Sequence, residues 1–346
     1  MYPWKGSKMY EPKTLQEFVG QPHIKEELEI AIENSRITNS ILGHTVLLGP
    51  PGYGKTTLAT IIGNSLNYRV MELFGGSFTE ETMDKVIGFI SKDSVPAIIF
   101  IDEIHAIKQR DAEFLYVPME NFKQNGILIP PFCVIGATTE FGKVIRPLRR
   151  RFRHQFRLKH YGVQDIVKVL SNRYCPLEIS KYIAPRSRLN PSEAINRWKD
   201  VLMEFTVQSQ KKETLMSVEL AKQVFDRKEI DNWGLDATDR AILNLLYNNH
   251  SFETAVHPQP TGIDVICVSL DLSRADYLGL HEPFLLQLDL IRRQPRGRVA
   301  TQKAIQFVVR PKDQYDNKQE EHKECFETQI EQMKKDGKLG NMLEEF

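Results

Sequence analysis

The chain has 346 residues, of which 41% are hydrophobic, and its formal net charge at pH 7 is +1. This length allows about two or three globular domains, and so small a net charge means that any nucleic-acid binding must depend on a local basic patch. The four cysteines, Cys133, Cys175, Cys267 and Cys325, lack paired metal-ligand spacing, so reduced thiols are expected rather than disulfides or zinc ligands.

The N-terminal residues, Met1 to Lys5, contain no apolar leader. No apolar run approaches the roughly 20 residues needed to cross a bilayer. We therefore expect a cytoplasmic protein without membrane association.

From about Leu15 to Leu158, strand and helix patterns alternate, which predicts a doubly wound α/β domain with a parallel sheet. Within it, residues 49–56 read GPPGYGKT and fit the P-loop pattern between an apolar strand at 45–48 and an apolar-faced helix. Glycines let backbone N–H groups converge on phosphate oxygens, and the helix N-terminus adds positive potential. We expect Lys55 to reach the β and γ phosphates of ATP and Thr56 to ligate Mg²⁺.

The next motif is the apolar run at 97–101, which predicts a central strand that ends in Asp102 and Glu103. Ligands of parallel sheets bind at the carboxyl ends of the strands. Asp102 is therefore expected to hold the magnesium shell, and Glu103 to polarise the attacking water. A merely solvated acidic loop is the alternative.

Beyond this strand the pattern changes twice. Residues 132–137 predict another buried strand, which ends at Thr138 and Thr139, and residues 163–230 read as helices. Residues 234–309 predict helical stretches at 239–247, 264–270 and 285–290 and then a basic hairpin at 291–301, which suggests a winged helix. After Pro311 the chain has six basic and ten acidic residues, so a solvated helix or disorder is expected there.

Taken together, these motifs resemble the RuvB family, the AAA+ motors of bacterial Holliday-junction branch migration, from Glu11 to about Val309. The matching strings are PKTL (12–15), FVGQ (18–21), GPPGYGKTTLA (49–59), IIFIDEIH (98–105), YVPME (116–120), PPFCVIGATTE (130–140), PLRRRF (147–152), GLD (234–236), DR (239–240), EPFL (282–285) and PRGRVAT (295–301). P-loops alone are common, whereas the last string behind a winged-helix pattern is far more discriminating.

The resemblance implies a role for each matching residue. It implies ATP binding by Phe18, Val19, Gly49, Pro51, Gly52, Gly54, Lys55, Thr56, Thr57 and Asp102, with Pro12 and residues 18–21 around the adenine. It makes Glu103 catalytic, Thr138 or Thr139 the sensor 1 group, and Arg151 an arginine finger that acts in a neighbouring subunit. A solvated basic turn is the alternative for 149–151. The implied assembly is a homo-oligomer, a hexameric ring, with ATP and Mg²⁺ as cofactors.

For DNA, the candidate contacts are Arg292, Arg293, Arg296 and Arg298, with Gly297 permitting a tight hairpin tip. Guanidinium groups suit phosphates, so these contacts would hold duplex or junction DNA without reading its sequence. A basic surface loop is the alternative reading.

Three departures from the family stand out. The sensor 2 arginine that follows a proline in the family is replaced here by Ser192 or Glu193, with Arg188 and Arg197 the nearest alternative cations. The family's arginine before Pro12 is Glu11. Only residues 122–129 occupy the interval where the family has a long β-hairpin that engages RuvA, so we expect that hairpin to be absent or a stub. Ile127 and Ile129 are the only residues that could keep a remnant contact, and the alternative is that they start the strand that runs into Pro130.

We therefore predict an AAA+ large domain (1–160), a helical lid (161–232), a winged helix (233–310) and a charged tail (311–346). The predicted function is that of an ATP-hydrolysing DNA motor in recombination or repair, with a RuvA-type partner doubtful. The alternatives are a loader that places another protein on DNA and, because sensor 2 is missing, a nucleotide-gated DNA-binding scaffold without motor activity.

Overall fold

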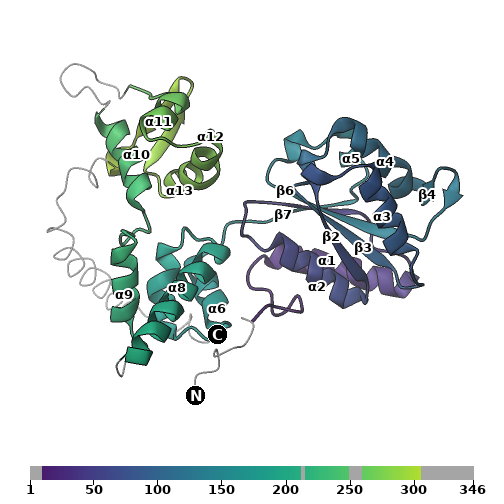
Figure 1. The fold of residues 1–346 in the computed structure, drawn as a ribbon, viewed down its shortest axis with the longest axis horizontal. Helices are drawn as coiled ribbons and strands as arrows, with labels where there is room; N and C mark the ends of the chain where they lie inside the picture. The colour runs from purple at the N-terminus through teal and green to yellow at the C-terminus, as the bar shows by residue number, and fades with distance from the viewer. Residues whose placement is uncertain (1–9, 212–214, 249–258, 305–346) are drawn as a thin grey trace, which may run out of the picture. The chain divides into compact units, whose positions relative to one another are not determined.

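A computed structural model describes residues 10–211, 215–248 and 259–304 (Figure 1). The predicted tail, 311–346, and residues 305–310 of the predicted winged helix lie outside the described residues. The chain divides into two compact units, one up to Gly234 and the other from Leu235 onward. Among the described residues, no helix has the length and apolar character needed to span a membrane.

The first unit is built on a five-stranded parallel sheet with the order β2-β3-β6-β1-β7. Its strands are β1 (Thr45–Leu48), β2 (Arg69–Phe74), β3 (Ala97–Asp102), β6 (Phe132–Thr138) and β7 (His154–Arg157). β1, β6 and all but the last residue of β3 are buried, as the apolar runs predict for central parallel strands. Because β1, β6 and β3 are neighbours, the ends of these three strands bring the P-loop, Thr138 and Asp102 to one edge of the sheet.

Helices cover both faces of this sheet (Figure 1). They are α1 (Pro22–Thr38), α2 (Lys55–Leu66), α3 (Glu80–Ile90), α4 (Gln109–Asn121) and the single turn α5 (Arg146–Arg149). Side chains along β1 point alternately to the two faces of the sheet, and each face has its own hydrophobic core. Leu47 packs with α1 and α2, whereas Val46 and Leu48 pack with α3, α4 and α5. The doubly wound α/β architecture expected from the sequence is confirmed.

In the described part of the predicted lid region, the regular elements are helices joined by loops. Its helices are α6 (Val163–Ser171), α7 (Leu177–Ile183), α8 (Pro191–Lys211) and α9 (Val218–Arg227). They enclose the fully buried Trp198, and their buried residues belong to the same apolar cluster as those of α1 and α2. The boundary at 160/161 stays a prediction.

A short hairpin with two residues in each strand follows α4. β4 (Lys123–Gln124) pairs antiparallel with β5 (Ile127–Leu128) around Asn125 and Gly126, both at positive φ, as a tight hairpin turn requires. Ile127 and Leu128 are 71% and 73% exposed, whereas Ile129 is 8% exposed and packs into the core under α4. The predicted stub is therefore present. Ile129 is buried and cannot serve as a remnant contact for a partner. The exposed apolar residues of the stub are Ile127 and Leu128.

The second unit contains α10 (Ala237–Asn248), α11 (Ile263–Ser269), α12 (Arg274–Asp276), a π-helical turn (Tyr277–His281) and α13 (Glu282–Gln287), followed by the hairpin β8 (Ile291–Gln294) and β9 (Gly297–Ala300). Thr261 bridges to Arg298 and adds a third, one-residue strand to the hairpin. Three helical segments and this strand pair form the expected winged helix. The sequence pattern predicted that the third segment begins at Leu285, but in the structure it begins earlier, at Arg274.

Candidate nucleotide site and DNA-binding wing

The P-loop connects β1 to α2, and its shape depends on glycines. Gly52 and Gly54 have φ of +78° and +89°, a region that residues with a Cβ rarely adopt. A Cβ on Gly52 would lie 2.5 Å from Oδ1 of Asn190 in the lid. The lid also bonds the loop directly, since Nδ2 of Asn190 donates to the Pro51 oxygen at 3.0 Å. α2 begins at Lys55 without a side-chain cap, so its first N–H groups face the loop.

Lys55 is buried and already oriented by the loop. Its Nζ donates to the backbone oxygens of Gly49 at 2.8 Å and Pro50 at 2.9 Å. Burial lowers the pKa of Lys55, and the carboxylates of Glu103 and Asp102 oppose that shift. The ammonium group therefore stands between the loop and the two acids, where a phosphate would complete its partners.

The two acids follow β3. Oδ1 of Asp102 accepts the Glu103 backbone N–H at 3.0 Å, and Glu103 adopts the left-handed backbone conformation with φ 48°. Within the described residues, the buried Oε2 of Glu103 accepts no hydrogen bond, although Nδ1 of His105 lies 3.0 Å away. This oxygen is therefore paired with His105, and its remaining lone pair can accept a hydrogen bond from an incoming water.

His105 links this acid to the end of β6. Its Nδ1 lies 2.8 Å from Oγ1 of Thr138, which is fully buried, whereas Thr139 is exposed. Nε2 of His105 lies 3.3 Å from a carboxylate oxygen of Glu140. The sequence predicted no role for His105, because its contact with Thr138 joins segments that are distant in sequence.

These elements enclose a cavity of about 330 Å³, within the size range of small-ligand sites. Of the predicted nucleotide ligands, Phe18, Val19, Pro51, Gly52, Gly54, Lys55, Thr56, Thr57, Asp102 and Glu103 line it. Tyr10 and Pro12 join them from the first domain, and Tyr161, Val169, Asn172, Arg173, Ser192 and Ile195 from the lid. Gly49 contributes instead through its oxygen to Lys55.

The predicted finger, Arg151, is not among the residues that line this cavity. Its guanidinium group donates to the backbone oxygens of Tyr116 at 2.9 Å and Pro147 at 2.8 Å, and to Oε2 of Glu120 at 2.7 Å. The group also lies 4.8 Å from the centre of the Tyr116 ring. Contacts within its own chain therefore hold the Arg151 guanidinium group, which does not line the cavity.

Neither candidate replacement for sensor 2 lines the cavity. Arg197 is 4% exposed, donates to Oε1 of Glu193 at 3.0 Å and lies over the Phe225 ring. Ser192 does line the cavity, and its backbone N–H donates to the Gly52 oxygen at 3.3 Å. The lid cation that lines the cavity is Arg173, which the motif comparison did not single out.

The hairpin β8–β9 is the wing of the winged helix, and its four predicted DNA contacts divide into two pairs. Arg292 and Arg296 are exposed, and Arg292 lies 3.5 Å from Asp289. Arg293 and Arg298 instead converge on Glu282, which is fully buried: Arg293 donates to it at 3.1 and 2.9 Å, and the Arg298 Nε also donates. The Arg298 side chain is only 12% exposed, so it is poorly placed for DNA, contrary to expectation.

Gly297 also differs from its expected role. The hairpin tip is Pro295 and Arg296, because Gln294 pairs with Gly297. A Cβ on Gly297 would lie 2.2 Å from the Thr261 oxygen, so glycine is needed for the close approach of the third strand rather than for the tip.

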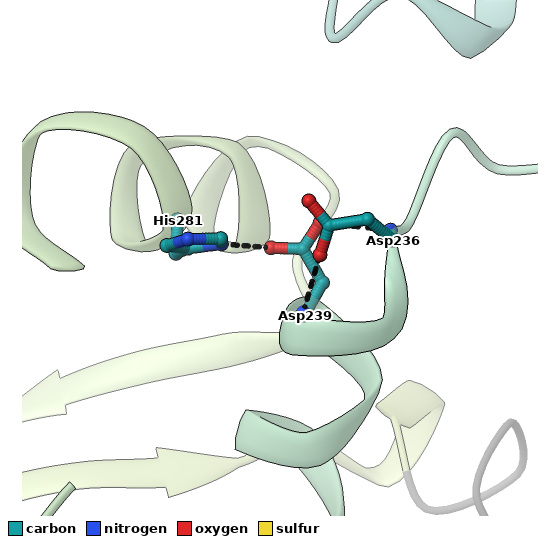
Figure 2. A group of neighbouring side chains, drawn as sticks. All are labelled: Asp236, Asp239 and His281. Carbon is teal, nitrogen blue, oxygen red and sulfur yellow. Dashed lines mark hydrogen bonds and ion pairs between the residues drawn. The ribbon is translucent and has the colours of Figure 1, made fainter. Parts of the chain in front are cut away.

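A compact acidic cluster lies at the start of α10, formed by Asp236, Asp239 and His281 (Figure 2). The backbone N–H of Asp239 donates to Asp236 Oδ1 at 2.8 Å, that of Asp236 donates to Asp239 Oδ2 at 3.2 Å, and Nδ1 of His281 lies 2.7 Å from Asp239 Oδ1. This is a reciprocal helix cap anchored by a histidine. The cluster fastens α10 to the π-helical turn.

The sheet order, the P-loop, the paired acids and the helical lid define a P-loop nucleotide-binding protein, here joined to a winged helix. The family model described as the Holliday junction DNA helicase RuvB P-loop domain matches residues 10–158, and the RuvB C-terminal winged helix domain matches residues 232–309. The chain belongs to the RuvB family, as its motifs predicted.

Individual relatives agree. The Holliday junction branch migration complex subunit RuvB of Fervidobacterium nodosum is 34% identical over 316 residues, which cover 86% of this chain and 88% of that protein. The subunit of the same name from Lactobacillus johnsonii is 32% identical over 322 residues, covering 88% and 92%. The solved Thermotoga maritima RuvB Holliday junction branch migration motor is similar with a TM-score of 0.74 and 31% identity, covering 87% of this chain and 98% of that one.

Proposed function

We propose that this protein is a ring-forming motor that hydrolyses ATP to drive branch migration of Holliday junctions during recombination or repair, in the cytoplasm. The observation that carries the proposal is the single cavity lined by the P-loop, both acids and the lid, because hydrolysis there can move the lid relative to the sheet. The match to the RuvB family and the winged helix support the part of the proposal that concerns DNA.

The residues at the cavity fit ATP with Mg²⁺. The Thr56 hydroxyl and the Asp102 carboxylate both line the cavity and offer the hard oxygen ligands that Mg²⁺ prefers. When bound, the ion would neutralise charge on the phosphates. Lys55 would contact the β and γ phosphates, and the Glu103 carboxylate would orient the attacking water, with Thr138 held nearby through His105.

A complete site requires a second subunit in this proposal. Arg151 does not line its own cavity, and its contacts to Tyr116, Pro147 and Glu120 keep its guanidinium group ordered. In a ring, preferably a hexamer, this group would complete the neighbour's site and stabilise transition-state charge.

The wing would bind DNA through the exposed Arg292 and Arg296, with Arg293, which is 60% exposed, contributing beside them. Such phosphate contacts hold a duplex in any sequence, as a motor requires. The two-residue hairpin β4–β5 gives little surface for a RuvA-type protein. We therefore propose that the motor loads on DNA unaided or through another adaptor.

The experiment is ATP turnover with and without duplexes of unrelated sequence, with Lys55→Ala as the inactive control. A motor predicts turnover that rises on every duplex. Nucleotide and DNA binding without turnover would instead support the scaffold, which the missing sensor 2 arginine favours.

A further inference from the structure

Arg173 lies just beyond α6, whose last turn faces the nucleotide cavity. Val169, Asn172 and Arg173 all line that cavity. The Arg173 Nη1 donates to the Val169 oxygen at 2.9 Å, which leaves further donors of its guanidinium group for a ligand. The backbone around it is fixed independently, because the Arg173 oxygen accepts the Trp198 Nε1–H at 3.3 Å.

The charges around Arg173 differ from those around Lys55. Burial lowers the pKa of Arg173, and the charges of Glu11 and Tyr10 oppose that shift. The corresponding charges at Lys55 are those of Glu103 and Asp102. One cavity is therefore lined by two separate cations: Lys55 is bonded to the phosphate-binding loop, and Arg173 is bonded to the last turn of α6.

Where the lid approaches the P-loop, it offers neutral groups. The Ser192 backbone N–H bonds to the Gly52 oxygen, and the Asn190 amide bonds to the Pro51 oxygen. Arg197 is turned into the lid against Glu193 and Phe225. Hence the lid's cation in this cavity is not placed with the groups that hold phosphates.

We propose that Arg173 is the lid residue that contacts the nucleotide, and that it binds the base and ribose rather than the γ phosphate. A guanidinium plane can stack on a purine and donate hydrogen bonds to ribose oxygens. Tyr10 and Pro12, which flank Glu11, line the same cavity and would form the other side of the base pocket. The lid then senses whether a nucleotide is bound, and distinguishes ATP from ADP only weakly.

This inference rests on the proposed function, because it assumes that the cavity binds ATP. The test is calorimetric titration of the full chain with ADP, with a non-hydrolysable ATP analogue and with inorganic tripolyphosphate, which lacks base and ribose. Arg173→Ala should weaken ADP and the analogue by the same factor, about tenfold or more, as expected for one lost charged contact. It should leave tripolyphosphate binding unchanged.

The matched control is Arg227→Ala, which removes a lid arginine that pairs with Glu204 on the lid surface, away from the cavity. It should change none of the three affinities. A larger loss for the ATP analogue than for ADP, a loss of tripolyphosphate binding, or unchanged affinities in Arg173→Ala would overturn the assignment. A parent chain that binds none of the three ligands would remove the proposed function itself, and this inference with it.

Discussion

Lys55 and Glu103 line the same cavity, but they are expected to act at different steps. In the proposed function, Lys55 would supply a charge to the phosphates whether or not hydrolysis occurs, whereas the Glu103 carboxylate would orient the attacking water. We predict that Lys55→Ala abolishes ATP binding and that Glu103→Gln retains binding but stops turnover. Titration with labelled ATP and a phosphate-release assay measure the two effects separately. Turnover in Glu103→Gln equal to that of the parent would contradict the role given to this acid.

Arg151 gives a prediction that depends on two subunits. Arginine fingers in other nucleotide hydrolases contribute about 10³ to 10⁵ in rate, so Arg151→Ala should lose most turnover while each subunit still binds ATP. Mixing Arg151→Ala with Lys55→Ala should restore part of the activity, because one composite site then contains both wild-type residues.

The control for this mixing experiment is Arg150→Ala, which alters the exposed neighbour of Arg151 and should leave turnover unchanged. Failure of the two inactive variants to rescue one another, in oligomers shown to contain both, would count against action in trans.

At this scale, motif spacing predicted the residues whose chemistry depends on adjacent backbone, such as Gly52, Lys55 and Asp102. It did not predict His105 or Arg173, because their roles arise from contacts made between distant segments. His105 contacts Thr138 across neighbouring strands, and Arg173 lines the same cavity as the distant Tyr10 and Pro12. No local pattern marks such a pair.

The wing is the element where exposure decides function. Arg296 lies at the exposed tip, so Arg296→Ala should weaken binding to all duplexes alike and reduce the log-log salt slope by about one, without changing the melting temperature. Salt-dependent DNA titrations and thermal unfolding measure these effects.

Arg298 is the matched comparison within the same hairpin. Arg298→Ala removes one of two arginines from the buried Glu282, and breaking a buried ion pair commonly costs about 3–5 kcal/mol, so the second unit should melt at a lower temperature. A pure loss of DNA affinity with unchanged stability in Arg298→Ala would show that it contacts phosphate after all.

The stub β4–β5 is the second element with a testable consequence. A partner that grips a hairpin needs buried anchors, each commonly worth about 2 kcal/mol or more, and the exposed large apolar residues of this stub are Ile127 and Leu128. We predict no tight binding of a RuvA-type protein from the same organism in a direct titration. Tight association that disappears in Ile127→Ser/Leu128→Ser would show that the stub is sufficient.

Element boundaries were the weaker part of the sequence prediction. The third helical segment of the second unit was placed at 285–290, but Ser273 caps a helix from Arg274 that continues through a π-helical turn into α13. Its exposed apolar residues, such as Leu278 and Leu280, blur the periodicity on which the prediction relied. Likewise, the glycine at 297 is explained only by Thr261, a strand partner distant in sequence.

At the scale of the whole molecule, the class of fold was predictable because buried parallel strands produce continuous apolar runs, and the runs ending at Leu48 and Asp102 carry recognisable motifs. The sheet order and the merging of the lid's core with that of α1 and α2 depend on packing between elements far apart in sequence. Those features needed the structure.

The central claim is that ATP turnover by this chain moves DNA. The most direct measurement is strand exchange in a synthetic four-way junction with mobile arms, followed by the separation of fluorescently labelled strands, for the parent and for Glu103→Gln. The account predicts ATP-dependent conversion of the junction to duplex products by the parent, and bound but unconverted junction with Glu103→Gln. Undiminished conversion without ATP, or vigorous ATP turnover on a bound junction whose arms never move, would contradict it.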